Sequence, residues 1–172
     1  YAYFFVVAKD QTMYSIALLL LGLATLEVIV GIYGRLERIH PDLARVATIL
    51  GVIGATGMTA HAGYDLANAI NPPLGLNLEL PSQVDPRGLL TFGFLGVAII
   101  KISFLLEKSR NFPKGLTYLG YLSGALLVII YLARLTVLDP TNPTLLYPVL
   151  INGFILSPLW YIWLGYSLLK KS

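Results

Sequence analysis

Five long, mostly apolar runs divide the sequence and constrain its fold more than any other feature. An α-helix needs about 20 such residues to cross the hydrocarbon core of a membrane. The runs extend from about 11 to 33, 43 to 70, 88 to 107, 116 to 138 and 144 to 169. The sequence therefore predicts an all-α polytopic bundle, a single transmembrane domain over residues 1–172.

The composition agrees with a location in a membrane. Of the 172 residues, 56% are hydrophobic and 12% are charged, whereas soluble domains carry about 25% charged residues. The absence of Cys excludes disulfides, zinc–thiolate centres, iron–sulfur clusters and cysteine nucleophiles. The net charge of +3 does not indicate a nucleic-acid partner, because the basic residues lie at the predicted helix ends.

Lys and Arg are distributed unevenly between the two sides of the predicted bundle. One side holds eight of them, namely Arg35, Arg38, Arg45, Lys108, Arg110, Lys114, Lys170 and Lys171. The other side holds three, namely Lys9, Arg87 and Arg134. Because cytoplasmic loops carry the excess of basic residues, we expect an outer N-terminus and a cytoplasmic C-terminus in a bacterial inner membrane.

The beginning of the sequence, YAYFFVVA, is apolar and lacks an initiator Met. In the predicted orientation this segment starts outside the cell. It therefore resembles the outer end of a preceding helix, and we expect a parent protein with six helices and both ends in the cytoplasm.

Small residues predict where the helices pack, since lipid gives helices no hydrophobic drive to associate. The second span carries four of them at a spacing of four, and the fourth span carries two. We therefore expect the second helix at the centre, clasped by the third and fourth helices. The residues are Gly51, Ala55, Thr59 and Gly63 in the second span, with Gly120 and Gly124 in the fourth.

Pro158 predicts a kink in the fifth span. Proline lacks a backbone donor and its ring presses on the carbonyl of Phe154, four residues earlier. Such a kink can serve as a gate, but a static bend is the more frequent outcome in membrane helices.

Two ionisable residues, Glu27 and Lys101, fall at the same predicted depth, about 9 Å inside the cytoplasmic boundary of their spans. An ion pair between them would remove the cost of burying either charge alone. The alternative is that Lys101 extends to the surface while Glu27 is protonated or bonded to a hydroxyl group.

The stretch MTAHAGYDLANA, residues 58–69, places His61 and Asp65 one turn apart in the outer half of the second span. Arg134 lies at a comparable depth in the fourth span. The three residues predict a polar intramembrane cluster, with an ion pair between Asp65 and Arg134. Such a cluster either locks the two helices together or forms a binding site for a proton or a polar ligand, and we favour the lock.

His61 is also a candidate ligand for a pigment or a metal. A single intramembrane histidine can bind the magnesium of a chlorophyll-type pigment, and Gly57 one turn earlier would leave room for a flat ring. Two axial histidines for a haem are excluded, since His40 lies in a loop. A metal at His61 and Asp65 would need further ligands from elsewhere. A lipid is a further candidate ligand.

Three segments of the second half carry a family resemblance: LPSQVDPRGLLTFG, FPKGLTYLGYLSG and SPLWYIWLGYSLL. With GRLERIHPDLARVA between the first two spans, the chain resembles uncharacterised bacterial multi-pass families known as domains of unknown function. The resemblance implies a helical membrane fold and assigns no role to any residue.

Two functions fit these features. The first is a non-catalytic accessory subunit of a larger membrane complex, such as an energy-converting or photosynthetic assembly. It is favoured by the small size and the lack of any catalytic motif. The second is a small transporter or a protein that binds a lipid or another hydrophobic ligand, with a polar site near His61, Asp65 and Arg134. An enzyme is not expected, because no nucleophile has a positioned base.

Overall fold

The computed structural model describes residues 8–72, 84–139 and 141–170, and the regular elements in these ranges are all helical. Each predicted span corresponds to one of five long apolar helices, which confirms the all-α fold with five candidate membrane spans. The segment 1–7, from which a sixth helix was predicted, lies outside the described residues. The elements are α1 (Gln11–Glu37), α2 (Pro41–Ile70), the 3-10 turn η2 (Pro86–Gly88), the π-helical segment η3 (Leu89–Phe94), α3 (Leu95–Ser109), α4 (Lys114–Arg134), α5 (Pro143–Ile151), the π-helical segment η4 (Asn152–Leu156) and α6 (Ser157–Leu169).

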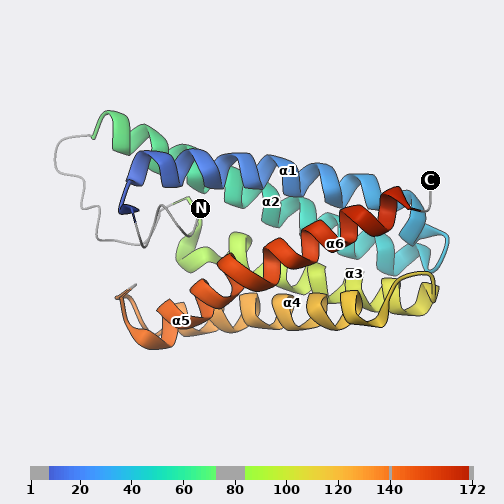
Figure 1. Cartoon of the computed structure of the whole chain (residues 1–172). Helices are drawn as coiled ribbons and strands as arrows, with labels where there is room; N and C mark the ends of the chain where they lie inside the picture. The colour runs from blue at the N-terminus through green and yellow to red at the C-terminus, as the bar shows by residue number, and fades with distance from the viewer. Residues whose placement is uncertain (1–7, 73–83, 140, 171–172) are drawn as a thin grey trace.

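Two antiparallel helix pairs and one diagonal helix make up the bundle. α1 packs against α2, α2 against α3, and α3 against α4. The third span consists of η2, η3 and α3, and the fifth consists of α5, η4 and α6. Figure 1 shows the fifth span crossing the bundle obliquely, from α4 at one end towards the end of α1 at the other.

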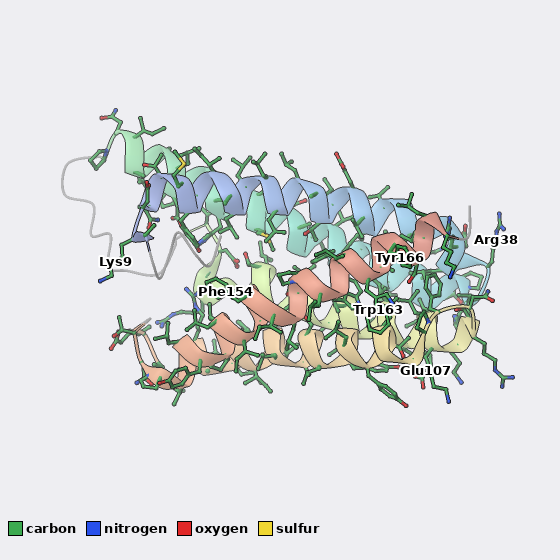
Figure 2. The ribbon with its side chains drawn as sticks, in the orientation of Figure 1. Lys9, Arg38, Glu107, Phe154, Trp163 and Tyr166 are labelled. Atoms are coloured by element: carbon green, nitrogen blue, oxygen red, sulfur yellow. The ribbon has the colours of Figure 1, made fainter. Side chains whose placement is uncertain are left out.

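The two ends of the bundle differ in charge. The short loops after α1 and α3 and the end of α6 meet at one end, on the right in Figure 1. Figure 2 places Arg38 and Glu107 at this end and Lys9 at the opposite one. The side chain of Arg35 donates to the carbonyl of Leu168 at 3.4 Å, so α1 and α6 meet there. We refer to the end of the bundle that holds the loops after α1 and α3 and the end of α6 as the basic end.

Side-chain caps determine where several helices begin. Asp10 accepts a hydrogen bond from the Met13 N–H at 3.0 Å at the start of α1. His40 accepts from the Leu43 N–H at 3.3 Å through Nδ1, and Pro41 follows it at the first position of α2. Thr141, in the turn before α5, donates to Asp139 through its hydroxyl and its N–H and lowers the pKa of that carboxyl.

The small residues of α2 pack against α1 on one face of the helix and against the third span on the other. Gly51 lies against Ile29 of α1, and Thr59 lies against Gly22 of the same helix. On the opposite face, Gly54 lies against Leu95 of α3. The predicted position of the second helix between the third and fourth was therefore wrong. α2 lies between α1 and the third span, with no described backbone contact to α4.

The glycines of α4 bring this helix close to α3 and α6. A Cβ added at Gly124 would lie 2.7 Å from the carbonyl oxygen of Gly96, so the two backbones cross there in direct contact. Gly120 faces the side chains of Ser103 and Trp160. The packing role predicted for Gly120 and Gly124 therefore holds, but towards α3 and α6. Gly63 of α2 meets nothing within 4 Å.

The fifth span departs from regular α-helix immediately before Pro158. The segment η4 is π-helical, and α6 resumes at Ser157. Because Pro158 has no N–H for the carbonyl of Phe154, the preceding turn cannot keep the regular hydrogen-bond pattern. The widened turn allows the proline to remain inside one continuous span, so the irregularity falls where the sequence predicts it.

Substituting Gly96 tests the close crossing of α3 and α4. Gly96→Ala should lower the free energy of unfolding by about 1–3 kcal/mol, because the new Cβ would meet the backbone carbonyl of Gly124 at 2.7 Å. Thermal unfolding in detergent measures the change. Gly63→Ala is the matched control, with open space around it, and should be neutral or slightly stabilising. Equal losses for both variants would contradict the crossing.

Candidate functional site: a polar cavity inside the bundle

A cavity of about 60 Å³ lies among the helices, in the half of the bundle opposite the basic end. Its apolar wall includes Leu18, Met58 and Leu127. Its polar residues come from all five spans and from the turn before the third. They are Tyr14, Thr25, His61, Asp85, Thr91, Arg134, Asn152, Ser157 and Tyr161.

A tight turn built around Asp85 supports one side of the cavity. Asp85 is 1% exposed and accepts hydrogen bonds from the N–H groups of Leu90 at 2.8 Å and Thr91 at 2.9 Å. Arg87 and Gly88 adopt positive φ angles of 60° and 77°, which is where glycine is favoured. The sequence VDPRGLL thus caps the start of η3 with a carboxylate.

The sequence reasoning treated Asp85 only as the residue before a helix and missed its place in the site. The signal was present, since an Asp followed by Pro and a Gly three residues later is typical of a tight turn. What the sequence did not show is that both carboxylate oxygens would turn inward onto backbone donors.

Both π-helical segments border the cavity. The segment η3 contributes Thr91 and η4 contributes Asn152, which are 5% and 2% exposed. Asn152 accepts a hydrogen bond from Ser123 of α4 at 2.8 Å through its side-chain carbonyl, so its amide nitrogen remains a donor. Since π-helical turns are rare and frequently mark functional sites, their position supports a functional role for the cavity.

His61 and Asp65 form a pair on α2, as their spacing suggested. Nε2 of His61 lies 3.1 Å from a carboxylate oxygen of Asp65, and the side chains are 16% and 20% exposed. The other ring nitrogen, Nδ1, is buried without a hydrogen-bond partner in the described structure. His61 therefore presents one satisfied nitrogen and one unsatisfied nitrogen to the interior.

Arg134 lies across the cavity from this pair, at the end of α4. Its guanidinium lies over the ring of Phe92, and the Cζ atom is 5.3 Å from the ring centroid. Among the described residues, no ion pair joins Arg134 to a carboxylate oxygen within 4.0 Å. The carboxylates of Asp85 and Asp65 interact with its charge only over a longer distance.

The predicted Asp65–Arg134 ion pair is therefore not formed. The segment η3 contacts both α2 and α4, and these two helices do not contact each other. Asp65 instead pairs with His61 on its own helix. Of the three residues, His61 and Arg134 line the cavity, and Asp65 is joined to it through its pair with His61.

Glu27 and Lys101 are not brought together either. No ion pair between them lies within 4.0 Å in the described residues. Glu27 is exposed on α1, whereas Lys101 is partly buried on α3. Equal depth along two spans does not determine which face of a helix carries the side chain.

The surroundings of His61 do not suit a pigment. Leu90 fills the space at Gly57 that a flat ring would need, and a cavity of about 60 Å³ is far smaller than a chlorophyll macrocycle. Nε2 already faces Asp65. Among the described residues, no group of three or more His, Cys, Asp or Glu side chains is placed to hold a metal ion.

The inner limit of the cavity is a contact between α1 and α6. Thr25, which is 1% exposed, donates a hydrogen bond to the hydroxyl of Tyr161 at 3.2 Å. The exposure of the lining residues falls from the partly exposed Tyr14 and Arg134, near the helix ends, to the buried Thr91 and Thr25. The cavity therefore extends from one end of the bundle towards its middle.

The five long apolar helices define the class of protein, a multi-pass helical membrane protein, and its interior holds a cavity lined by both polar and apolar side chains. Comparison of the chain with protein-family models, curated proteins and solved structures finds no match. The resemblance to uncharacterised multi-pass families therefore stays a prediction.

A double-mutant cycle tests the pairing at the site. His61→Ala and Asp65→Ala should show a coupling energy of about 0.5–3 kcal/mol, as groups in direct contact do. The same cycle for Asp65→Ala and Arg134→Ala should stay below about 0.5 kcal/mol. Unfolding in detergent gives the four stabilities of each cycle. A larger coupling for Asp65 with Arg134 than with His61 would contradict the geometry.

Proposed function

We propose that this protein is a small transporter or ligand-binding protein that takes a small polar ligand into the intramembrane cavity. One observation carries the proposal. His61 and Thr91 both line the cavity, and each has a buried polar atom, Nδ1 and Oγ1, without a hydrogen-bond partner in the described structure.

Unpartnered polar atoms are costly inside a protein. Leaving one buried donor or acceptor unsatisfied costs about 1–3 kcal/mol, and lipid offers no alternative partner. Two such atoms beside one cavity are best explained if water or a ligand binds to them. The size agrees with this reading, because a buried water needs about 10–15 Å³ by the same measure, so about 60 Å³ holds several.

The role we propose is not catalytic. In the described residues, His61 contacts Asp65 and has no hydrogen bond to a Ser or Thr hydroxyl. A histidine and a carboxylate on one helix can bind a polar group, but acyl transfer also needs a nucleophile within reach of the base.

The side of the membrane follows from charge. The cavity lies in the half of the bundle away from Arg35, Arg38 and the other basic loop residues. With the basic end in the cytoplasm of a bacterial cell, the cavity approaches the outer surface. A ligand would then enter from outside the inner membrane.

Single-cysteine labelling tests the cavity directly, because the chain contains no Cys. Thr91→Cys should react with a small, membrane-impermeant thiol reagent added to intact cells, because a thiol at this position would face the cavity. Ser103→Cys should not react, since Ser103 is fully buried between α3 and α4 and does not line the cavity.

Labelling is read by mass spectrometry of the purified protein. Failure of Thr91→Cys to react in intact cells and in inverted vesicles would overturn the proposed site. Reaction only in inverted vesicles would keep the site and reverse the orientation.

An accessory role in a larger complex is the second candidate, and a groove on the outer surface favours it. The groove has a volume of about 700 Å³ and lies between α4 and α6 near the basic end. Figure 2 shows Trp163 and Tyr166, two of its residues, on α6. Its residues fall at the spacing of a helix-packing face: Tyr118, Leu119 and Leu122 on α4, with Leu159, Ile162, Trp163 and Tyr166 on α6.

Such a double row suits one transmembrane helix of a partner subunit. Gly115, at the end of the row on α4, lies directly against the ring of Trp163, so α4 and α6 are closely packed at the floor of the groove. Membrane lipids contact the remaining exposed apolar surface, which includes Leu20, Ile53 and Ile129.

Purification in mild detergent tests this second candidate. A partner should co-purify with the native chain and be lost from Ile162→Trp, which fills the groove. It should remain with Ile53→Trp, on an exposed face of α2. Mass spectrometry and size measurement decide the result. A stable 18.8 kDa monomer without partner, or equal recovery with both variants, would count against a subunit role.

A further inference from the structure

The cavity is richer in unused donors than in unused acceptors. The guanidinium of Arg134 carries five N–H donors, and the groups that interact with it are the ring of Phe92, Tyr14 and the charges of Asp85, Arg87 and Asp65. The Asn152 amide nitrogen is also a donor, since the side-chain carbonyl is taken by Ser123. The Thr91 hydroxyl, on a side chain that is 5% exposed, has no partner.

The oxygen acceptors of Asp65, Asp85 and Tyr161 are already engaged, whereas Nδ1 of His61 has no hydrogen-bond partner in the described structure. Both oxygens of Asp85 accept backbone N–H groups, at 2.8 and 2.9 Å. The carboxylate of Asp65 faces Nε2 of His61 at 3.1 Å. The hydroxyl of Tyr161 accepts from Thr25 at 3.2 Å, which leaves its own proton to donate. A ligand that supplies acceptors would therefore complete this cavity, whereas a cation would not.

We propose that the cavity binds a small oxyanion, a carboxylate group, held by the guanidinium of Arg134 beside Thr91. This inference rests on the proposed function and names its ligand class. The planar fork of arginine matches a carboxylate with two parallel hydrogen bonds. The guanidinium lies over the ring of Phe92, with its Cζ 5.3 Å from the ring centroid, so a cation–π contact holds it beside the cavity.

Size limits the group that enters. A volume of about 60 Å³ holds about five water molecules, so the part of the ligand inside the cavity has only a few non-hydrogen atoms. A carboxylate with a short chain fits as a free acid. A longer acid fits only if its chain lies outside the cavity, between the helices and the lipid.

The local charge allows one negative group. Arg134 and Arg87 carry positive charge at this end, and Arg87 also donates to the backbone carbonyl of Arg134 at 3.4 Å. Asp85 and Asp65 carry negative charge and both interact with Arg134. The region is thus near neutral when empty, and a monovalent anion is better suited to it than a multivalent one.

Protection of Thr91→Cys from labelling tests this ligand class in the full chain in detergent. Acetate and decanoate, below its micelle concentration, serve as the two probes, and chloride at equal ionic strength is the control. A bound carboxylate should slow labelling about tenfold at a concentration near ten times its dissociation constant, whereas chloride should not. Protection by both acids indicates recognition of the carboxylate alone, and protection by acetate alone indicates a small free acid.

Variants of Arg134 complete the test. Adding Arg134→Gln to Thr91→Cys should abolish the protection, and adding Arg134→Lys should retain part of it. Arg38→Gln, at the basic end, should leave the protection unchanged, and thermal unfolding confirms that each variant is folded.

Undiminished protection with Arg134→Gln, or no protection by either acid in the folded single variant, would overturn the proposal. If Thr91→Cys labels without acid but no acid protects it, the oxyanion is excluded and the hydrated site remains. If it never labels, the proposed function itself fails.

Discussion

Close contact between helix backbones is the constraint on which the rest of this structure depends. Lipid provides no hydrophobic drive for association, so the helices must gain stability through van der Waals contact over a short distance. Gly22 meets Thr59 between α1 and α2, Gly54 meets Leu95 between α2 and α3, and Gly96 meets Gly124 between α3 and α4. These contacts join four spans in chain order. The fifth span is held obliquely across them, by α4 and by side-chain bonds to α1.

The cavity is bordered by two spans that depart from regular helix. In the third span, the Asp85 cap and the positive φ of Gly88 lead into a π-helical segment. In the fifth, the missing donor of Pro158 follows a second π-helical segment. Polar side chains on these segments face the same interior as His61 and Arg134. Their unused donors carry both the proposed function and the inferred class of ligand.

Predictions from sequence succeeded where the relevant interaction is local and failed where it depends on which helices are neighbours. The His61–Asp65 pair follows from a spacing of four on one helix. The Asp65–Arg134 and Glu27–Lys101 pairs required knowledge of the helix faces, and equal depth does not supply it. The small residues of α2 were recognised, but they line both faces of that helix, so they could not show that Gly51 and Thr59 face α1.

The sequence by itself determined that the described part of the chain is an all-α membrane protein with five candidate spans, because apolar length and the need to satisfy the backbone in lipid favour long helices. It also predicted the unequal charge of the two ends and the place where Pro158 interrupts a helix. Only the tertiary structure decided that η3 separates α2 from α4 and that Asp85 turns inward. It also brought polar residues from all five spans around one cavity. These features depend on how each helix is rotated about its own axis, which is decided jointly by the packing of all its neighbours.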